Sequence, residues 1–168
     1  MQIDKKDYNA ELHDVYKALT VKQPFADLLT KVTGRDAEGQ FTADKTIEVR
    51  SRATKYRGDL LICSSAKPEI PGRMSGVVCG FVEVYDCKPV EDFTEADWEA
   101  TCLPEAERAK THKGWGWFVR NPRRVVEMPI KGKLGLYDLI VPKGDITIYP
   151  QHFAFGEYGW GVVKKKIK

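Results

Sequence analysis

Residues 45–51 read Lys45-Thr46-Ile47-Glu48-Val49-Arg50-Ser51, and they indicate a β-strand more clearly than any other segment. Apolar and polar side chains alternate here, which is typical of a strand because successive side chains point to opposite faces. We expect Ile47 and Val49 to point inward. Glu48 and Arg50 then share the other face, and Lys45 lies at the mouth of the strand. This density of charge is unusual for a strand and indicates a place for recognition or chemistry.

The sequence before this segment predicts a strand, a helix and a loop. Residues 16–21 are rich in strand-forming residues. Pro24 favours a helix start, because its missing N–H would be unpaired in the first helical turn. Four apolar residues then follow at helical spacing, namely Phe25, Leu28, Leu29 and Val32. We expect this helix to end near Gly34, and the polar residues 35–44 to form an exposed loop next to Lys45.

The sequence after residue 51 predicts mostly strands. We expect them at residues 59–65, 76–87, 114–119, 125–128, 136–141 and 157–164. Two short helices are expected between them, one capped by Thr94 and one beginning at Pro104. Many short strands, few helices and frequent glycines are typical of a mainly β (α+β) fold, here a β-barrel with a few flanking short helices.

The composition is that of an ordinary globular protein, and 168 residues fit a single domain over residues 1–168. The net charge of +3 does not require a nucleic-acid partner, so a basic surface has to come from local clustering. The sequence shows no signal-peptide pattern and no apolar run long enough to span a membrane. We therefore expect a cytoplasmic protein without membrane contact.

The four cysteines argue against a metal site. They form no Cys-x-x-Cys pair and have no histidine close in sequence, whereas zinc ligands cluster at short spacings. Cys63 and Cys79 lie in apolar runs, where a free cysteine behaves as a small buried hydrophobe. We expect reduced thiols, no metal and no cofactor.

The chain resembles the ASCH domain family, named after the activating signal cointegrator. Lys45, Glu48 and Arg50 match the last three fixed positions of the family signature GxKxxExR, and Ala43 stands where the signature has glycine. Further similar segments are residues 19–26, 57–67, 76–87, 121–122 and 129–132. The resemblance covers about residues 16–140. It leaves an amino-terminal extension, residues 1–15, and carboxyl-terminal strands with a basic tail, residues 141–168.

This resemblance implies a PUA-like barrel with a basic cleft between the first helix and the strand of residues 45–51. It implies binding of RNA, or of another nucleic acid, as the best-supported function. Some family members resemble amidohydrolases of modified nucleosides, and another branch is linked to RNA cleavage. A hydrolase of either kind is therefore an alternative function. A protein-interaction domain in a coregulator-like assembly is a further alternative.

The candidate nucleic-acid-binding residues combine cations with hydrogen-bonding groups. Lys45 can contact a phosphate as a point charge, and Arg50 can grip one with paired hydrogen bonds. Glu48 can accept hydrogen bonds from a base edge, or it can order the strand through an internal ion pair with Arg50. The other candidates lie at a helix start and a strand end, where capping and turn formation are the simpler roles: Lys22, Gln23, Ser64, Ser65 and Lys67.

Lys45 and Glu48 are also the candidate catalytic residues. In the nucleoside amidohydrolase branch a threonine nucleophile lies three residues after the lysine, and Glu48 takes that place here. A ribonuclease would need an acid–base pair instead, for which Lys45 with Glu48 or Tyr56 is a candidate. Trp115 and Trp117 are expected in the core, although Trp115 is the candidate for base stacking if one is exposed.

Overall fold

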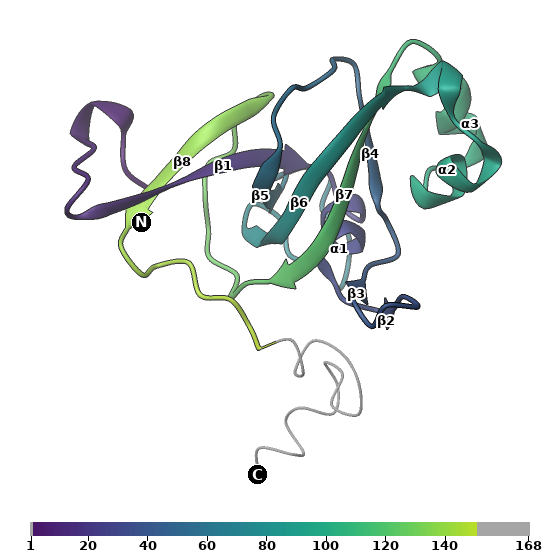
Figure 1. Ribbon diagram of the computed structural model, residues 1–168. Coiled ribbons are helices and arrows are strands. Elements are labelled where there is room, and N and C mark those ends of the chain that lie inside the picture. Colours follow the sequence, from purple (N-terminus) through teal and green to yellow (C-terminus); the bar gives the residue numbers. More distant parts are fainter. Residues whose placement is uncertain (1, 151–168) are drawn as a thin grey trace.

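The computed structural model describes residues 2–150, which form one curled β-sheet with helices at its sides (Figure 1). The six strands of this sheet lie in the order β4-β7-β6-β5-β1-β8. Their bounds are β1 His13–Val21, β4 Ile47–Arg50, β5 Gly58–Ser64, β6 Val78–Pro89, β7 Trp115–Arg124 and β8 Leu136–Pro142. Neighbouring strands run antiparallel, except that β1 and β5 are parallel.

Short helices and a small hairpin complete the described part of the chain. The helices are α1 Phe25–Thr30, α2 Glu95–Ala100 and α3 Glu105–Arg108, with 3-10 turns at Lys5–Asp7, Val90–Asp92 and Ala109–Thr111. The hairpin pairs β2 Gly34–Arg35 with β3 Phe41–Thr42. We call residues 90–114, which connect β6 to β7, the arm. Figure 1 shows its helices beyond the β4 edge of the sheet.

Both faces of the sheet are buried. The cluster under α1 contains Leu19, Val21, Ala26, Leu29, Leu60, Ile62, Val82, Val84, Trp117 and Val119. The cluster on the opposite face contains Ala18, Leu61, Cys63, Val78, Phe81, Val125, Tyr137 and Leu139. Because alternate side chains of one strand enter different clusters, the strands appear as nearly continuous apolar runs in the sequence.

The predicted mainly β fold with a few short helices is confirmed. The strands expected at residues 16–21, 45–51, 59–65, 76–87, 114–119 and 136–141 correspond to β1, β4, β5, β6, β7 and β8. The predicted cap of α2 is also present. The Thr94 hydroxyl accepts the N–H of Asp97 at 3.1 Å, and the Asp97 carboxylate accepts the N–H of Thr94 at 3.0 Å. This reciprocal pair satisfies two N–H groups at the helix start.

Residues 35–44 are not the loop that the sequence predicts, because they contain most of the β2–β3 hairpin. The Asp36 carboxylate accepts N–H bonds from Glu38 at 3.0 Å and Gln40 at 2.9 Å. The guanidinium of Arg35 lies 4.6 Å from the centre of the Phe41 ring. An aspartate that closes a turn on its own backbone gives no hydrophobic periodicity, which is why the pattern missed the hairpin.

Two further element boundaries differ from the prediction. Helix α1 ends at Thr30 rather than near Gly34, because Lys31 has extended backbone angles and the chain then enters the hairpin. Residues 125–128 make only an isolated bridge, Val125 with Ile148, since the chain leaves the sheet there to cover its outer face. The strand predicted at residues 157–164 lies outside the described residues.

Ile47 of β4 is buried, as predicted, but the charged face of the strand is covered as well. Glu48 pairs with Trp117, a member of the cluster under α1, and directly opposed residues share one face. The charged face of β4 therefore points toward the interior. Ile47 is buried on the other face, where the Phe93 ring leaves no room for a side chain at Gly116. Because both faces of β4 are covered, the alternation of apolar and polar residues could not show which face points toward the cluster under α1.

Cys63 and Cys79 are buried free thiols, as predicted. Burial raises the pKa of Cys63 to about 12 and also raises the pKa of Cys79. Both thiols therefore stay protonated at neutral pH and act as packing residues. Among residues 2–150, no helix has the length and apolarity needed to cross a bilayer, and no group of three metal-binding side chains comes together.

Candidate nucleic-acid interface

The three signature residues form one chain of ion pairs at the amino end and along β4. The Lys45 ammonium lies 3.3 Å from Glu48 Oε1, and Arg50 Nη1 donates to Glu48 Oε2 at 3.2 Å. Exposure rises along this chain, from 1% for the Lys45 side chain to 11% for Glu48 and 28% for Arg50. We call these residues the Glu48 relay. One carboxylate holds a buried cation on one oxygen and presents a second cation to solvent on the other.

The buried end of the Glu48 relay is enclosed by α1 and by the arm. Lys45 Nζ donates to the Thr101 carbonyl at 2.5 Å and lies 5.0 Å from the centre of the Phe25 ring. Two further bonds join the arm to this segment, from Thr46 N–H to the Ala100 carbonyl at 3.0 Å and from Cys102 Sγ to the Asp44 carbonyl at 3.5 Å. The ammonium is thus paired as burial requires. In this arrangement it has no surface left for a phosphate.

Two tryptophans support the exposed end of the Glu48 relay. Trp115 lies directly opposite Arg50, and Trp117 is opposite Glu48. Trp117 is 5% exposed, as expected of a core residue, and its indole N–H donates to the Arg52 carbonyl at 2.9 Å. Trp115 is half-buried and packs against the same core cluster. The indole bond fixes the backbone that follows β4.

The connection from β4 to β5 is strongly basic, and this is the signal that sequence reasoning missed. Residues 50–57 contain Arg50, Arg52, Lys55 and Arg57 and no acidic residue. The side chains of Arg52 and Lys55 are exposed, whereas Thr54 between them is buried. A count of charge in short windows would have found this cluster. We call residues 50–57 the basic connection.

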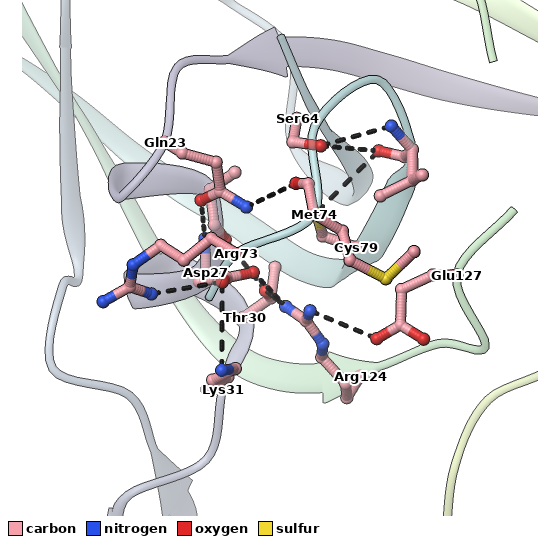
Figure 2. A network of polar contacts seen from close by, with 12 residues as sticks. Gln23, Asp27, Thr30, Lys31, Ser64, Arg73, Met74, Cys79, Arg124 and Glu127 are labelled. Carbon is pink, nitrogen blue, oxygen red and sulfur yellow. Dashed lines mark hydrogen bonds and ion pairs between the residues drawn. The ribbon is translucent and has the colours of Figure 1, made fainter. Parts of the chain in front are cut away.

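Gln23 and Ser64 take part in a buried polar network rather than facing solvent (Figure 2). Gln23 accepts the N–H of Asp27 at 3.1 Å and donates its side-chain N–H to the Met74 carbonyl at 2.9 Å. Ser64 exchanges hydrogen bonds with the backbone of Val77 at 3.2 and 3.3 Å. For Gln23 and Ser64 the sequence left two roles open, namely ligand binding and a structural role in capping or turn formation. The observed contacts are those of the structural role.

Asp27 is the centre of this network, and three cations surround its carboxylate (Figure 2). Its oxygens lie 2.9 Å from Arg124 Nη1, 3.1 Å from Arg73 Nη1 and 3.8 Å from Lys31 Nζ. Burial alone would raise the pKa of Asp27. The charge of Arg124, hydrogen bonds from Gln23 and Arg124, and the charge of Lys31 outweigh it and hold the pKa below its usual value. The network joins α1 to β7 and to the loop before β6.

The candidate residues are divided between the two ends of β6. Arg50 pairs with Trp115, which pairs with Pro89 at the carboxyl end of β6. Ser64 follows Cys63, which pairs with Val78 at the amino end. A strand of 12 residues spans roughly 35 Å. Arg50 therefore lies far from Ser64 and from its neighbours Ser65 and Lys67. Lys45, at the buried end of the Glu48 relay, instead lies beside Phe25 of α1, close to Lys22 and Gln23 at the start of that helix.

A groove of about 590 Å³ lies between the β2–β3 hairpin, α1 and the β6–β7 pair. Lys45 and Arg120 are the cations in its lining, whereas Asp36, Glu38 and Glu83 are acidic. Its lining thus carries more carboxylates than cations. Such a lining does not favour the phosphates of a nucleic acid. The basic connection offers the more suitable surface.

Lys45 and Glu48, the candidate catalytic pair, are engaged with each other. Glu48 is buried and both of its oxygens are bound by cations, while the Lys45 ammonium is covered by Thr101. Tyr56, the other candidate, donates its hydroxyl to the Asp59 carbonyl, and burial raises its pKa. A proton donor or acceptor must reach its substrate within hydrogen-bond distance. The geometry suits positioning of Arg50 better than proton transfer.

Comparisons with known proteins agree with this fold. A sequence model of the ASCH domain matches residues 37–129, which include the Glu48 relay, the basic connection and the arm. Two crystal structures of mutant ZmASCH from Zymomonas mobilis are similar in fold. One has a TM-score of 0.50 at 14% identity and covers 68% of this chain and 75% of ZmASCH. The other has a TM-score of 0.53 at 13% identity and covers 72% and 85%. Among curated proteins, no sequence matches this chain.

Proposed function

Because this chain belongs to the ASCH domain family, whose PUA-like fold is often linked to RNA binding, we propose that it binds RNA through the basic connection and Arg50. The observation that carries this proposal is the run of four cations without an acid from Arg50 to Arg57. Phosphate contacts supply most of the affinity of non-specific nucleic-acid binding. A local cluster of this kind provides them although the net charge of the chain is only +3.

The proposal assigns different roles to the residues of the Glu48 relay. Arg50 contacts a phosphate, since its side chain is 28% exposed and its guanidinium is already oriented by Glu48. Glu48 and Lys45 are positioning residues, because their polar atoms are occupied by one another and by Thr101. Trp117 fixes the backbone at Arg52, so that the exposed cations of the basic connection start from a rigid strand end.

The test is binding of a fluorescent single-stranded RNA of about 16 nucleotides, the upper end of the site sizes that single OB folds cover. The double variant Arg52→Ala/Lys55→Ala should bind roughly tenfold more weakly at low salt and show a shallower salt dependence. Lys6→Ala/Lys143→Ala removes the same charge from exposed positions outside the basic connection and is the matched control. Equal affinity of the two double variants would contradict the proposal.

The same samples separate binding from catalysis. RNA recovered after incubation is run on a denaturing gel, with Lys45→Met beside the unmodified protein. Intact RNA is expected in every lane. Fragments that appear with the unmodified protein and disappear with Lys45→Met would instead support a hydrolase that uses the buried end of the Glu48 relay.

A further inference from the structure

A second basic surface lies at the opposite end of β6 from Arg50. It is a groove of about 460 Å³ between the ends of β1 and β5 and the loop before β8. Its lining includes the hydroxyls of Thr20 and Ser65 and the side chains of Lys131 and Lys133, and no carboxylate. We call it the hydroxyl–lysine groove. Its volume is in the range of pockets that hold a nucleotide-sized ligand.

The loop that carries the two lysines is held in place from three sides. The Gln2 side-chain amide bonds both the N–H and the carbonyl of Lys131, at 2.8 and 3.1 Å. Ile130 N–H donates to the Gly76 carbonyl at 3.0 Å. A side chain at Gly132 would approach Thr20 Oγ1 to 2.7 Å, so the loop backbone rests directly on β1. A fixed backbone lowers the entropy cost of placing the lysines around a ligand.

The Ser65 hydroxyl and the two lysines of the hydroxyl–lysine groove are available to a ligand, whereas the Thr20 hydroxyl shares a hydrogen bond with the Tyr137 hydroxyl at 3.1 Å. Within residues 2–150, Lys131 and Lys133 have no acidic partner, and no hydrogen bond engages the Ser65 hydroxyl. Lys22 and Lys67 lie nearby, because Val21 pairs with Ser64 and Lys67 follows Ala66 of the lining. Lys67 is paired with the exposed Glu69 at 3.9 Å and is therefore not counted among the ligand groups. Cations and hydroxyls without a competing carboxylate favour an anion.

One apolar side chain completes the edge of the hydroxyl–lysine groove. Leu134 lines it and is 98% exposed, directly after Lys133. Apolar side chains next to phosphate-binding cations are used to support or separate bases in nucleic-acid complexes. A phosphate with an attached base therefore fits the chemistry of this groove better than a free inorganic anion does.

We propose that the hydroxyl–lysine groove binds a phosphodiester of single-stranded nucleic acid, with Lys131, Lys133 and Ser65 on the phosphate and Leu134 against the base. This inference rests on the proposed RNA-binding function and adds a second contact region at the other end of the sheet. An RNA strand held at both ends of β6 would lie along the molecule rather than in one cleft. Ser65, Lys22 and Lys67, which the sequence singled out, belong to this second region.

The central experiment is the salt dependence of binding to the RNA of about 16 nucleotides for Lys131→Ala/Lys133→Ala. Each phosphate contact on a single strand contributes about 0.7 to the slope of log K against log salt, so the slope should fall by about 1.4. The control Lys6→Ala/Lys143→Ala should keep the slope of the unmodified protein. Gly132→Ala retains both lysines but displaces the loop from Thr20, and should weaken binding without any change of charge. An unchanged slope in Lys131→Ala/Lys133→Ala together with unchanged affinity in Gly132→Ala would overturn the proposal.

Separate readouts distinguish this proposal from the function on which it rests. If Arg52→Ala/Lys55→Ala weakens binding but the groove variants do not, the groove proposal alone fails. If RNA does not bind at all, amide shifts of Ser65 and Gly132 are followed by NMR during titration with a 5′-phosphorylated dinucleotide. Amide shifts confined to Ser65 and Gly132 would support a phosphate site in the groove. The absence of such shifts would overturn the proposal. A third outcome is also informative. If the protein sediments with anionic phospholipid vesicles, and Leu134→Ser abolishes this sedimentation but leaves RNA affinity unchanged, the groove binds a membrane surface and the proposal is overturned.

Discussion

Asp27 and Glu48 are both nearly buried carboxylates held by cations, but their buried cations come from different parts of the fold. Asp27 is 3% exposed and its closest cation, Arg124, is 4% exposed. Glu48 is 11% exposed and its outer cation, Arg50, is 28% exposed. Asp27 also binds Arg73 and Lys31, which are 28% and 38% exposed, so both networks reach the surface. They differ in the buried cation. Arg124 comes from β7 and joins α1 to the sheet, whereas Lys45 comes from the segment that also carries Glu48 and is covered by the arm.

The largest expected effect tests whether the Asp27 network is structural. Arg124→Met leaves the Asp27 charge buried beside weaker partners and should lower the free energy of unfolding by about 3–5 kcal/mol. Urea titration measures it. Arg120→Met on the same strand removes a 59% exposed guanidinium paired with Glu83, and should change stability little. Similar losses from both substitutions would contradict the structural role of the network.

A smaller effect is expected from the partly open Glu48 relay. Glu48→Gln leaves the Lys45 ammonium buried without a counter-charge and should cost about 2 kcal/mol, together with a loss of RNA affinity because Arg50 is no longer oriented. Combining Lys45→Met with Glu48→Leu should recover much of the stability but not the affinity. A double-mutant cycle measured by urea titration tests this. Full recovery of RNA binding in the double variant would show that Arg50 needs no positioning.

The Asp27 network should also lose stability in acid. The folded pKa of Asp27 lies below its unfolded value of about 3.8, so its ionised form stabilises the fold above that pH. This stability is lost as the pH falls from about 4 through the lower folded pKa. Asp27→Asn should therefore be less stable at neutral pH and show a shallower loss of stability in acid. Parallel profiles for the variant and the unmodified protein, measured by urea titration from pH 7 to pH 3, would argue against this role.

The smallest expected effect concerns the arm, which covers the buried end of the Glu48 relay. Thr94→Ala removes the cap of α2 and should cost about 1 kcal/mol. The loss should loosen the arm, so hydrogen exchange of the Thr46 N–H, which donates to Ala100, should become faster. The Val125 N–H, which donates to Cys79 near the Asp27 network, should be unaffected. Equal acceleration at both amides would indicate that the arm is not an independent unit.

Sequence patterns predicted the strands well because most strand residues are apolar on both faces or bounded by clear turn residues. They predicted the cap at Thr94 because capping depends on residues within one turn. They failed for residues 35–44, where the Asp36 carboxylate forms the turn without a hydrophobic signal. They predicted the burial of Ile47 but not the covering of the charged face of β4, because that depends on the pairing of Glu48 with the distant Trp117.

The sequence predicted only part of the candidate site. The signature residues were identified, and the alternative of an internal ion pair described the observed contact between Glu48 and Arg50. The burial of Lys45 under Thr101 could not be foreseen, since it depends on how the arm folds back. The separation of Ser64 from Arg50 could not be foreseen either, because it depends on the directions in which the strands pair.

The pairing of β4 also determines when the proposed interface can exist. In the described part of the chain β4 has a single strand neighbour, β7, and Arg50 is opposite Trp115. The basic connection is made early in synthesis, but the strand that holds its first residue in place emerges from the ribosome much later. Contacts between residues so far apart in sequence form slowly and late in folding. A nascent or truncated chain that stops before β7 therefore carries the cations without the geometry that orients them.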